Sequence, residues 1–217
     1  MKHENQRNFY IATYMLLAFM LWTAAIQMID VQAIGPQGSS VGFATINRFV
    51  HNLTGVHMSL YTITDWLGLV PLVFVMGFAL LGLIQWIQRK HLFKVDYNIL
   101  VLGGFYIVVM AVYILFEVFV VNYRPVLIEG ILEASYPSST TMLVMCVMPT
   151  AMMQINTYIK NDILKRSVAS AFTAFVIFMV IGRLISGVHW FTDIIGGVLL
   201  STGLVLIYHV IARLEIL

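Results

Sequence analysis

The sequence is short of charge. Only 10% of its 217 residues are Asp, Glu, Lys or Arg, while 60% are hydrophobic and the mean hydropathy is +0.91. Soluble globular domains carry about 25% charged residues, so these values exclude an ordinary soluble domain and predict an integral membrane protein. The net charge of +2 gives no indication of a nucleic-acid partner.

Cysteine is nearly absent as well. The single Cys146 excludes an intrachain disulfide and any multi-cysteine metal site, and its place in an apolar run is typical of a small buried hydrophobe. The sequence shows no internal repeat, low-complexity tract or long linker. The first apolar run is long and has no clear cleavage site, so it predicts a retained span and not a signal peptide. We expect one membrane domain over residues 1–217.

Six apolar runs are long enough to cross a bilayer as helices. We therefore predict an all-α fold, a bundle of six transmembrane helices. Ser138 or Ser139 is expected to cap the fourth helix, and Pro71 to kink the second near one end. Residues 41–50 are expected to form a short helix in the membrane interface. The predicted spans lie near residues 9–29, 66–87, 98–121, 139–155, 168–186 and 194–212.

Lysine and arginine are unevenly distributed along the chain. Nine of the twelve lie near the termini or in the loops after the second and fourth spans. The positive-inside rule then places both termini in the cytoplasm, and residues 30–65, 122–139 and 183–193 together on the other side of the membrane. A bacterial plasma membrane is the expected location. The exceptions are Arg48, Arg124 and Arg183, and an anionic ligand is the simplest reason for them.

The segment between the fifth and sixth spans carries an unusual polar group. Arg183 precedes His189 by six residues, and Asp193 follows it by four. If the chain is helical from His189, that spacing places the imidazole and the carboxylate one turn apart on one face. Asp193 could then hold one ring nitrogen and leave the other free to attack or to accept a proton. The alternative is an interfacial loop whose polar residues only mark the membrane edge.

Two further pieces are expected on the same side of the membrane: Arg124-Pro125 and the run Tyr136-Pro137-Ser138-Ser139-Thr140. Together with the Arg-His-Asp group, and in the same order and spacing, they resemble the signature motifs of the type 2 phosphatidic acid phosphatase family. Those motifs are Lys-x6-Arg-Pro, Pro-Ser-Gly-His and Ser-Arg-x5-His-x3-Asp. The six predicted spans extend the resemblance to the whole chain.

The resemblance implies a role for each matching residue. His189 would be the nucleophile that forms a phosphohistidine, and Asp193 would hold its other ring nitrogen. Arg124 and Arg183 would clamp the phosphoryl oxygens. The start of the fourth helix would add donors from its backbone and from its first side chains, Ser138, Ser139 and Thr140. No metal ion or cofactor is implied, and the substrate would be a lipid phosphate among membrane lipids.

The chain also departs from the family pattern. Gly182 replaces the leading serine of the third motif, and Glu117 stands in the place of the lysine. Ser139 and Thr140 stand in the places of glycine and of the histidine that protonates the leaving oxygen in the family. We expect Glu117 either to lie buried in the bundle as a protonated carboxyl or to pair with an arginine.

Thr140 bears on the choice of substrate. A general acid contributes about 10²–10⁴-fold to rate, and its loss costs most when the leaving group is a simple alkoxide. A lipid diphosphate leaves as a phosphate monoester, so Thr140 favours a polyprenyl diphosphate over phosphatidate. Alternatively, His51 or His57 replaces the missing acid, and Arg48 replaces the missing cation.

The leading hypothesis is a membrane lipid phosphatase that removes phosphate from a lipid phosphate or polyprenyl diphosphate on the extracytoplasmic side. A first alternative is a lipid-phosphate-binding protein that has lost turnover with the two motif residues. A second is a phosphotransferase that passes the phosphoryl or head group to an alcohol other than water. Phosphate release and product analysis would separate the three.

Overall fold

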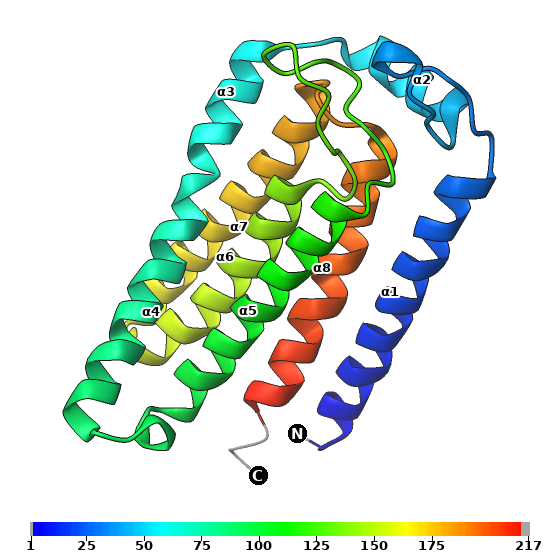
Figure 1. Cartoon of the computed structure of the whole chain (residues 1–217). Coiled ribbons are helices and arrows are strands. Elements are labelled where there is room, and N and C mark those ends of the chain that lie inside the picture. The colour runs from blue at the N-terminus through cyan, green and yellow to red at the C-terminus, as the bar shows by residue number, and fades with distance from the viewer. Residues whose placement is uncertain (1, 214–217) are drawn as a thin grey trace.

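The computed structural model describes residues 2–213, which form α-helices joined by turns and loops (Figure 1). This arrangement confirms the predicted all-α class. Short 3-10 turns occur at Pro36–Gly38 and Leu92–Lys94. The α-helices are α1 (Lys2–Met28), α2 (Ala44–Thr54), α3 (Met58–Leu67), α4 (Leu69–Arg89), α5 (Tyr97–Val118), α6 (Ser139–Tyr158), α7 (Asp162–Ile185) and α8 (Phe191–Ala212).

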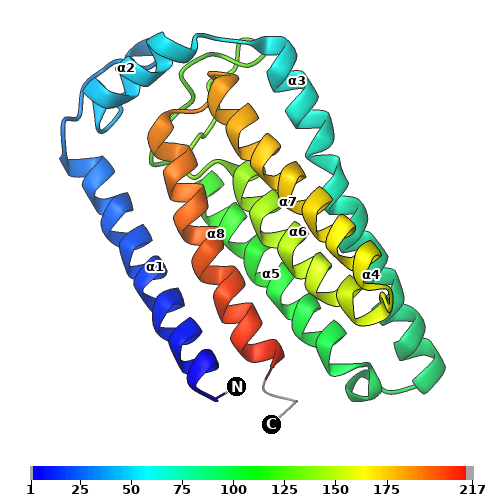
Figure 2. The ribbon, with the colours of Figure 1, turned by 180° about the vertical axis from the view of Figure 1, so that it is seen from behind.

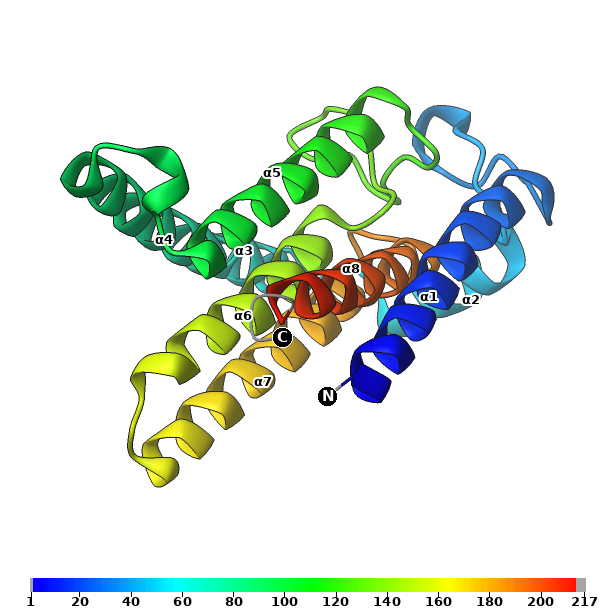
Figure 3. The ribbon, with the colours of Figure 1, turned by 90° about the horizontal axis from the view of Figure 1, so that it is seen from below.

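Helix α6 is the centre of the bundle. It contacts α4, α5, α7 and α8, while α1 packs along α8 (Figures 2 and 3). Its buried side chains include the polar Thr140, Thr150 and Gln154. Neighbouring helices shield α6, so it can carry more polar groups than a helix that faces lipid. Five other segments are long and apolar enough to cross a membrane: His3–Met28, Met58–Arg89, Tyr97–Val118, Asp162–Ile185 and Phe191–Ala212.

The second long helical segment begins earlier than the sequence pattern predicts. The predicted boundary is residue 66, whereas α3 begins at Met58. The polar residues that suggest a loop are accommodated inside the helix. Thr62 donates to the backbone oxygen of Met58 at 3.0 Å, and Thr64 donates to that of Leu60 at 2.9 Å. Because these hydroxyls are satisfied within the helix, the boundary is corrected to Met58.

A break separates α3 from α4 at Gly68, three residues before Pro71. Proline has no N–H, so Pro71 cannot bond to the carbonyl of Leu67 four residues earlier. The Gly68 amide instead donates to the carbonyls of Thr64 and Asp65, both at 3.0 Å. This confirms the predicted effect of Pro71. The break follows directly after Asp65, whose side chain reaches the functional site.

Both described ends of the chain lie at the same end of the bundle (Figure 1). There Arg213 forms an ion pair with Glu4 at 3.1 Å. The opposite end, which we call the loop end, holds α2, the loop of residues 119–138 and the turn between α7 and α8. The interfacial helix predicted at residues 41–50 is present as α2, shifted a few residues along the chain.

Tyr136 anchors the long loop to the bundle. Its ring is 1% exposed, stacks on Phe19 of α1 and meets Phe116 of α5 edge-on. Its hydroxyl shares a 2.7 Å hydrogen bond with Thr23 of α1. On α8 the ring packs so closely on Gly196 that a Cβ there would lie 2.4 Å from it. The loop is thereby fixed against three helices, and the residues on either side of Tyr136 are held in place.

Candidate active site

Two guanidinium groups converge on one nitrogen of His189. The Nη1 atom of Arg124 lies 3.4 Å from His189 Nε2, and the Nη2 atom of Arg183 lies 3.3 Å from it. All three side chains are buried, and Arg183 is only 1% exposed. Arg124 comes from the loop after α5 and Arg183 from the last turn of α7, so the tertiary fold brings the two cations together. The sequence alone predicts this convergence, and the structure shows it.

The turn that carries His189 is held tightly against α2. Gly187 has a φ of +70°, a conformation that favours glycine. A Cβ at Gly187 would lie 2.0 Å from the carbonyl oxygen of Gly55, the residue that ends α2. The two backbones therefore meet at a position that only glycine can occupy. This contact fixes where the imidazole sits.

Asp193 does not contact His189 directly. The hydroxyl of Ser135 donates to Asp193 Oδ2 at 2.6 Å and lies 3.0 Å from His189 Nδ1. The expectation of a direct contact is wrong because the chain is not helical at His189. Helix α8 begins at Phe191, and Trp190 is its extended N-cap residue. Asp193 is thus in the first turn, where it also accepts from the Trp190 amide at 2.9 Å and from Asn122 at 3.1 Å.

The contacts of the imidazole define its protonation. Nε2 faces only cationic donors here, so it is the acceptor nitrogen, and Nδ1 carries the hydrogen. Nδ1 then donates to the hydroxyl of Ser135 or to its carbonyl oxygen at 3.2 Å. Burial, and then the charges of Arg124 and Arg183, hold the pKa of His189 well below its usual range. The ring is a neutral base with its free electron pair directed between two guanidinium groups.

Each arginine is paired with an acid that the sequence analysis does not place in the site. Arg124 Nε lies 3.0 Å from Glu133 Oε2, and Arg183 Nη1 lies 3.6 Å from Asp65 Oδ1. The Tyr61 ring of α3 lies beneath both cations, with its centroid 6.0 and 5.0 Å from their Cζ atoms. These partners fix the direction of the guanidinium planes.

The start of α6 closes another side of the site. Ser138 is the N-cap residue, as predicted, but its hydroxyl makes no cap hydrogen bond. Within the part of the chain that the structure describes, this buried hydroxyl has no hydrogen-bond partner. The Ser138 amide donates to the backbone oxygen of Asp193 at 3.1 Å, which ties α6 to the start of α8. A free hydroxyl beside a helix N-terminus is suited to an anion.

Two of the predicted auxiliary residues lie outside this cluster. Arg48 is exposed on α2, where its charge acts on the nearby Asp30. His57 is exposed, and its Nε2 lies 2.8 Å from the backbone oxygen of Thr54. Arg48 therefore does not stand in for the missing cation, and His57 is turned to its own backbone. Short polar helices give no signal in sequence for the direction of such side chains.

The other two auxiliary residues lie at the margin. His51 is half-buried, with its ring centroid 5.5 Å from that of Trp190, and burial lowers its pKa. Glu117 is exposed near the end of α5, where it lines a small pocket with Ser135 and Ser139. The expectation that Glu117 is buried is wrong. Helix α5 is apolar on every side, so its pattern does not reveal which face turns outward.

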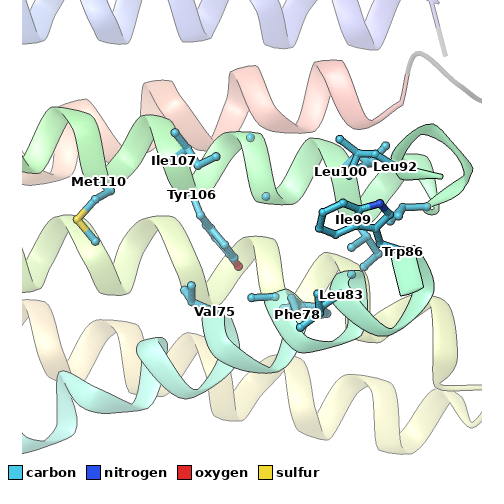
Figure 4. Close-up of a pocket in the computed structure, with 15 residues that line it drawn as sticks. Val75, Phe78, Leu83, Trp86, Leu92, Ile99, Leu100, Tyr106, Ile107 and Met110 are labelled. Carbon is cyan, nitrogen blue, oxygen red and sulfur yellow. The ribbon is translucent and has the colours of Figure 1, made fainter. Parts of the chain in front are cut away.

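An apolar cavity begins at the site and runs along the bundle. Its first part, of about 370 Å³, has Asp65, Ser139 and Thr140 at its polar end. A second part, of about 560 Å³, continues between α4 and α5 towards the end that holds the termini (Figure 4). The two parts share Val75, Tyr106 and Met110 in their walls.

The cavity is long for a membrane protein. Its lining on α4 extends from Leu69 to Trp86, which is about 25 Å at the rise of an α-helix. The hydrocarbon core of a bilayer is about 30 Å thick, so one leaflet supplies about half of that. The cavity is therefore longer than the depth of one leaflet.

Comparison with known proteins agrees with this geometry. The model of the PAP2 superfamily matches residues 9–216. Among solved structures, the crystal structure of a transmembrane PAP2-type phosphatidylglycerolphosphate phosphatase from Bacillus subtilis has the same fold. That match has a TM-score of 0.58 at 19% identity and covers 93% of this chain and 94% of the other. No curated protein matches the sequence. The chain is an integral membrane protein, and it belongs to the PAP2 superfamily.

Proposed function

We propose that the protein is a membrane lipid phosphatase that acts through a phosphohistidine, with a polyprenyl diphosphate as its preferred substrate. One observation carries the proposal: the free electron pair of His189 Nε2 is directed between Arg124 and Arg183, at 3.4 and 3.3 Å. A nucleophile and two fixed cations around one small space are what phosphoryl transfer requires.

In the first half of the reaction, Nε2 attacks the terminal phosphorus and the bond to the leaving oxygen breaks. The two arginines stabilise the charge on the equatorial oxygens, and the free hydroxyl of Ser138 adds a donor at the start of α6. As Nε2 bonds to phosphorus, the ring becomes cationic. The Ser135 hydroxyl carries the influence of Asp193 to Nδ1 and stabilises that charge. The guanidinium groups supply the positive charge, so the mechanism calls for no metal ion.

The cavity supports a lipid substrate. It opens beside Asp65, Ser139 and Thr140 and offers apolar walls to a chain longer than one leaflet is deep. A polyprenyl chain has that length. Thr140 agrees with this choice, because a phosphate monoester leaves without the general acid that a threonine cannot supply.

We place the site on the extracytoplasmic side of a bacterial plasma membrane, with six spans and both termini in the cytoplasm. The distribution of charge supports this placement, because basic residues gather away from the loop end. They lie close to the termini and in the α4–α5 and α6–α7 connections: Lys2, Arg7, Arg89, Lys90, Lys94, Lys160, Lys165, Arg166 and Arg213.

Phosphate release in detergent tests the proposal. Wild type and His189→Ala are compared on phosphatidate, phosphatidylglycerolphosphate and polyprenyl diphosphates. We expect release by wild type only, fastest with a polyprenyl diphosphate. Equal background rates for both proteins on every substrate would reject the enzyme and leave a binding protein. Phosphoryl transfer to an added alcohol at the expense of water would identify a transferase.

A further inference from the structure

The carboxylate of Asp65 lies where the phosphate site meets the lipid cavity. Its Oδ1 is 3.6 Å from Nη1 of Arg183, whose Nη2 is 3.3 Å from His189 Nε2. One guanidinium therefore stands between the carboxylate and the nucleophile. Asp65 also lines the cavity together with Thr140, the residue in the place of the missing family histidine. A carboxylate thus lies on the side from which that histidine is absent.

The direction of the reaction adds to this placement. In-line displacement requires the leaving group to depart opposite the attacking nitrogen, and the water that later hydrolyses the phosphohistidine to enter from that same face. The lipid tail occupies the cavity, so the mouth of the cavity marks this face. Among the described residues that line the mouth, Asp65 carries the carboxyl group. Its side chain is 58% exposed, so it can exchange protons with water.

We propose that Asp65 is the general base that activates the hydrolytic water. In this step a water proton moves to the Asp65 carboxylate and the water oxygen forms a bond to phosphorus. The P–Nε2 bond breaks, and its electron pair returns to the imidazole of His189. The products are inorganic phosphate, neutral His189 and a protonated Asp65 that releases its proton to solvent.

The other groups near the site are less suited to this step. Glu133 is paired with Arg124 Nε and comes from the loop, and it is not part of the cavity lining. A threonine hydroxyl such as that of Thr140 cannot accept a proton at neutral pH. His51 packs against Trp190, and His57 faces the backbone of Thr54. Only the second half of the reaction needs a base when the leaving group is a phosphate monoester, so one carboxylate completes the chemistry.

This inference rests on the proposed function, and labelling of the enzyme separates the two. Wild type and Asp65→Asn are mixed with a polyprenyl diphosphate that carries ³²P in its terminal phosphate, quenched at short times and assayed for protein-bound label. We expect Asp65→Asn to be labelled on His189 and to retain the label, while its steady-state turnover falls by about 10²–10⁴-fold. Asp65→Glu should restore part of the turnover and shorten the life of the label.

Three further variants make the result decisive. Asp162→Asn makes the same chemical change at the first residue of α7, away from the site, and should turn over like wild type without accumulating label. His189→Ala combined with Asp65→Asn should take no label; label there would reject the proposed nucleophile and with it the proposed function. Glu133→Gln disturbs Arg124 and should slow labelling and turnover together.

Two results would overturn the inference alone. If labelling and turnover of Asp65→Asn fall by the same factor, Asp65 only orients Arg183 and is not the base. If Glu133→Gln retains the label and Asp65→Asn does not, the base is Glu133.

Discussion

Ser135 donates a 2.6 Å hydrogen bond to the carboxylate of Asp193, and both groups are buried. The same hydroxyl lies 3.0 Å from Nδ1 of His189. The acid therefore acts on the imidazole through a hydroxyl, not through direct contact. This leaves Asp193 free to bind the amide that begins α8, so one carboxylate serves the helix start and the nucleophile together.

Replacing this hydroxyl should slow the reaction without unfolding the protein. In Ser135→Ala the buried carboxylate of Asp193 loses a donor and Nδ1 of His189 loses a partner. A hydrogen bond to a charged group contributes about 1.5–3 kcal/mol, which corresponds to a loss of roughly 10–100-fold in kcat. Phosphate release measures the loss. Ser170→Ala, at an exposed site on α7, is the matched control and should keep full activity. Unchanged kcat in Ser135→Ala would show that the hydroxyl carries no influence.

The protonation of His189 predicts a pH dependence of activity. Burial and two arginines hold its pKa well below 6.5, so the nucleophile stays neutral as the pH falls through that value. The acidic limb of kcat/KM should therefore lie below pH 6.5. Arg124→Gln removes one positive charge, so it should move that limb to higher pH while lowering the rate. A limb that does not move would contradict the electrostatic account.

The same lowered pKa predicts how stability varies with pH. Below pH 6.5 the unfolded chain binds a proton at His189 and the folded chain does not. The unfolded state thus binds more protons, and stability falls as the pH drops from 6.5 towards the folded pKa; above 6.5 this residue has no effect. Thermal unfolding across that range checks the sign. His189→Asn should flatten part of the dependence.

Gly196 should tolerate no side chain. In Gly196→Ala the new Cβ would lie 2.4 Å from the buried ring of Tyr136, which cannot move away from Phe19 and Phe116 without breaking their contacts. Overpacking of this kind costs about 1–3 kcal/mol. Gly77→Ala on α4 is the control: nothing lies within 4 Å of its added Cβ, so it should stabilise the helix by about 0.5–1 kcal/mol. Melting temperatures in detergent compare the two, and equal values would contradict the packing described.

Filling the cavity should discriminate between substrates by chain length. Gly104 lines the deeper part of the cavity and has nothing within 4 Å of an added Cβ. In Gly104→Leu the side chain displaces the far end of a long tail. The loss of two buried methylenes, at about 0.8 kcal/mol each, lowers kcat/KM by roughly tenfold.

A short-chain diphosphate does not reach Gly104, so its turnover should not change. Gly77→Leu is the matched control, since it adds the same side chain on α4 outside the cavity lining. If Gly104→Leu treats long and short chains alike, the tail does not lie in this cavity.

The sequence predicts the elements of the site better than their contacts. Arg124, Arg183 and His189 follow from polar residues that interrupt apolar runs, and their meeting follows from loops that share one end of a bundle. Ser135 and Glu133 do not follow from any pattern. Their positions depend on how the loop folds back, with the Arg124 amide bonded to the Glu133 carbonyl at 3.0 Å. Such pairing in an irregular loop has no periodicity to read.

Asp65 and Glu117 illustrate a second limit. Both are acids near helix ends at the loop end, yet Asp65 meets Arg183 and Glu117 faces outward. The difference depends on the rotation of each helix about its axis. An all-round apolar helix does not encode that rotation in its hydrophobic pattern, and the packing of its neighbours sets it.

The cavity between α4 and α5 also determines how substrate arrives. Its walls include Leu72 and Met110, whose side chains are exposed at the outside of the bundle. A lipid can therefore enter sideways and keep its tail out of water throughout. Encounter is then a search in two dimensions, and the rate depends on the mole fraction of substrate in the surface. Diluting a fixed amount of substrate with inert detergent should slow turnover even when its concentration in the tube is unchanged.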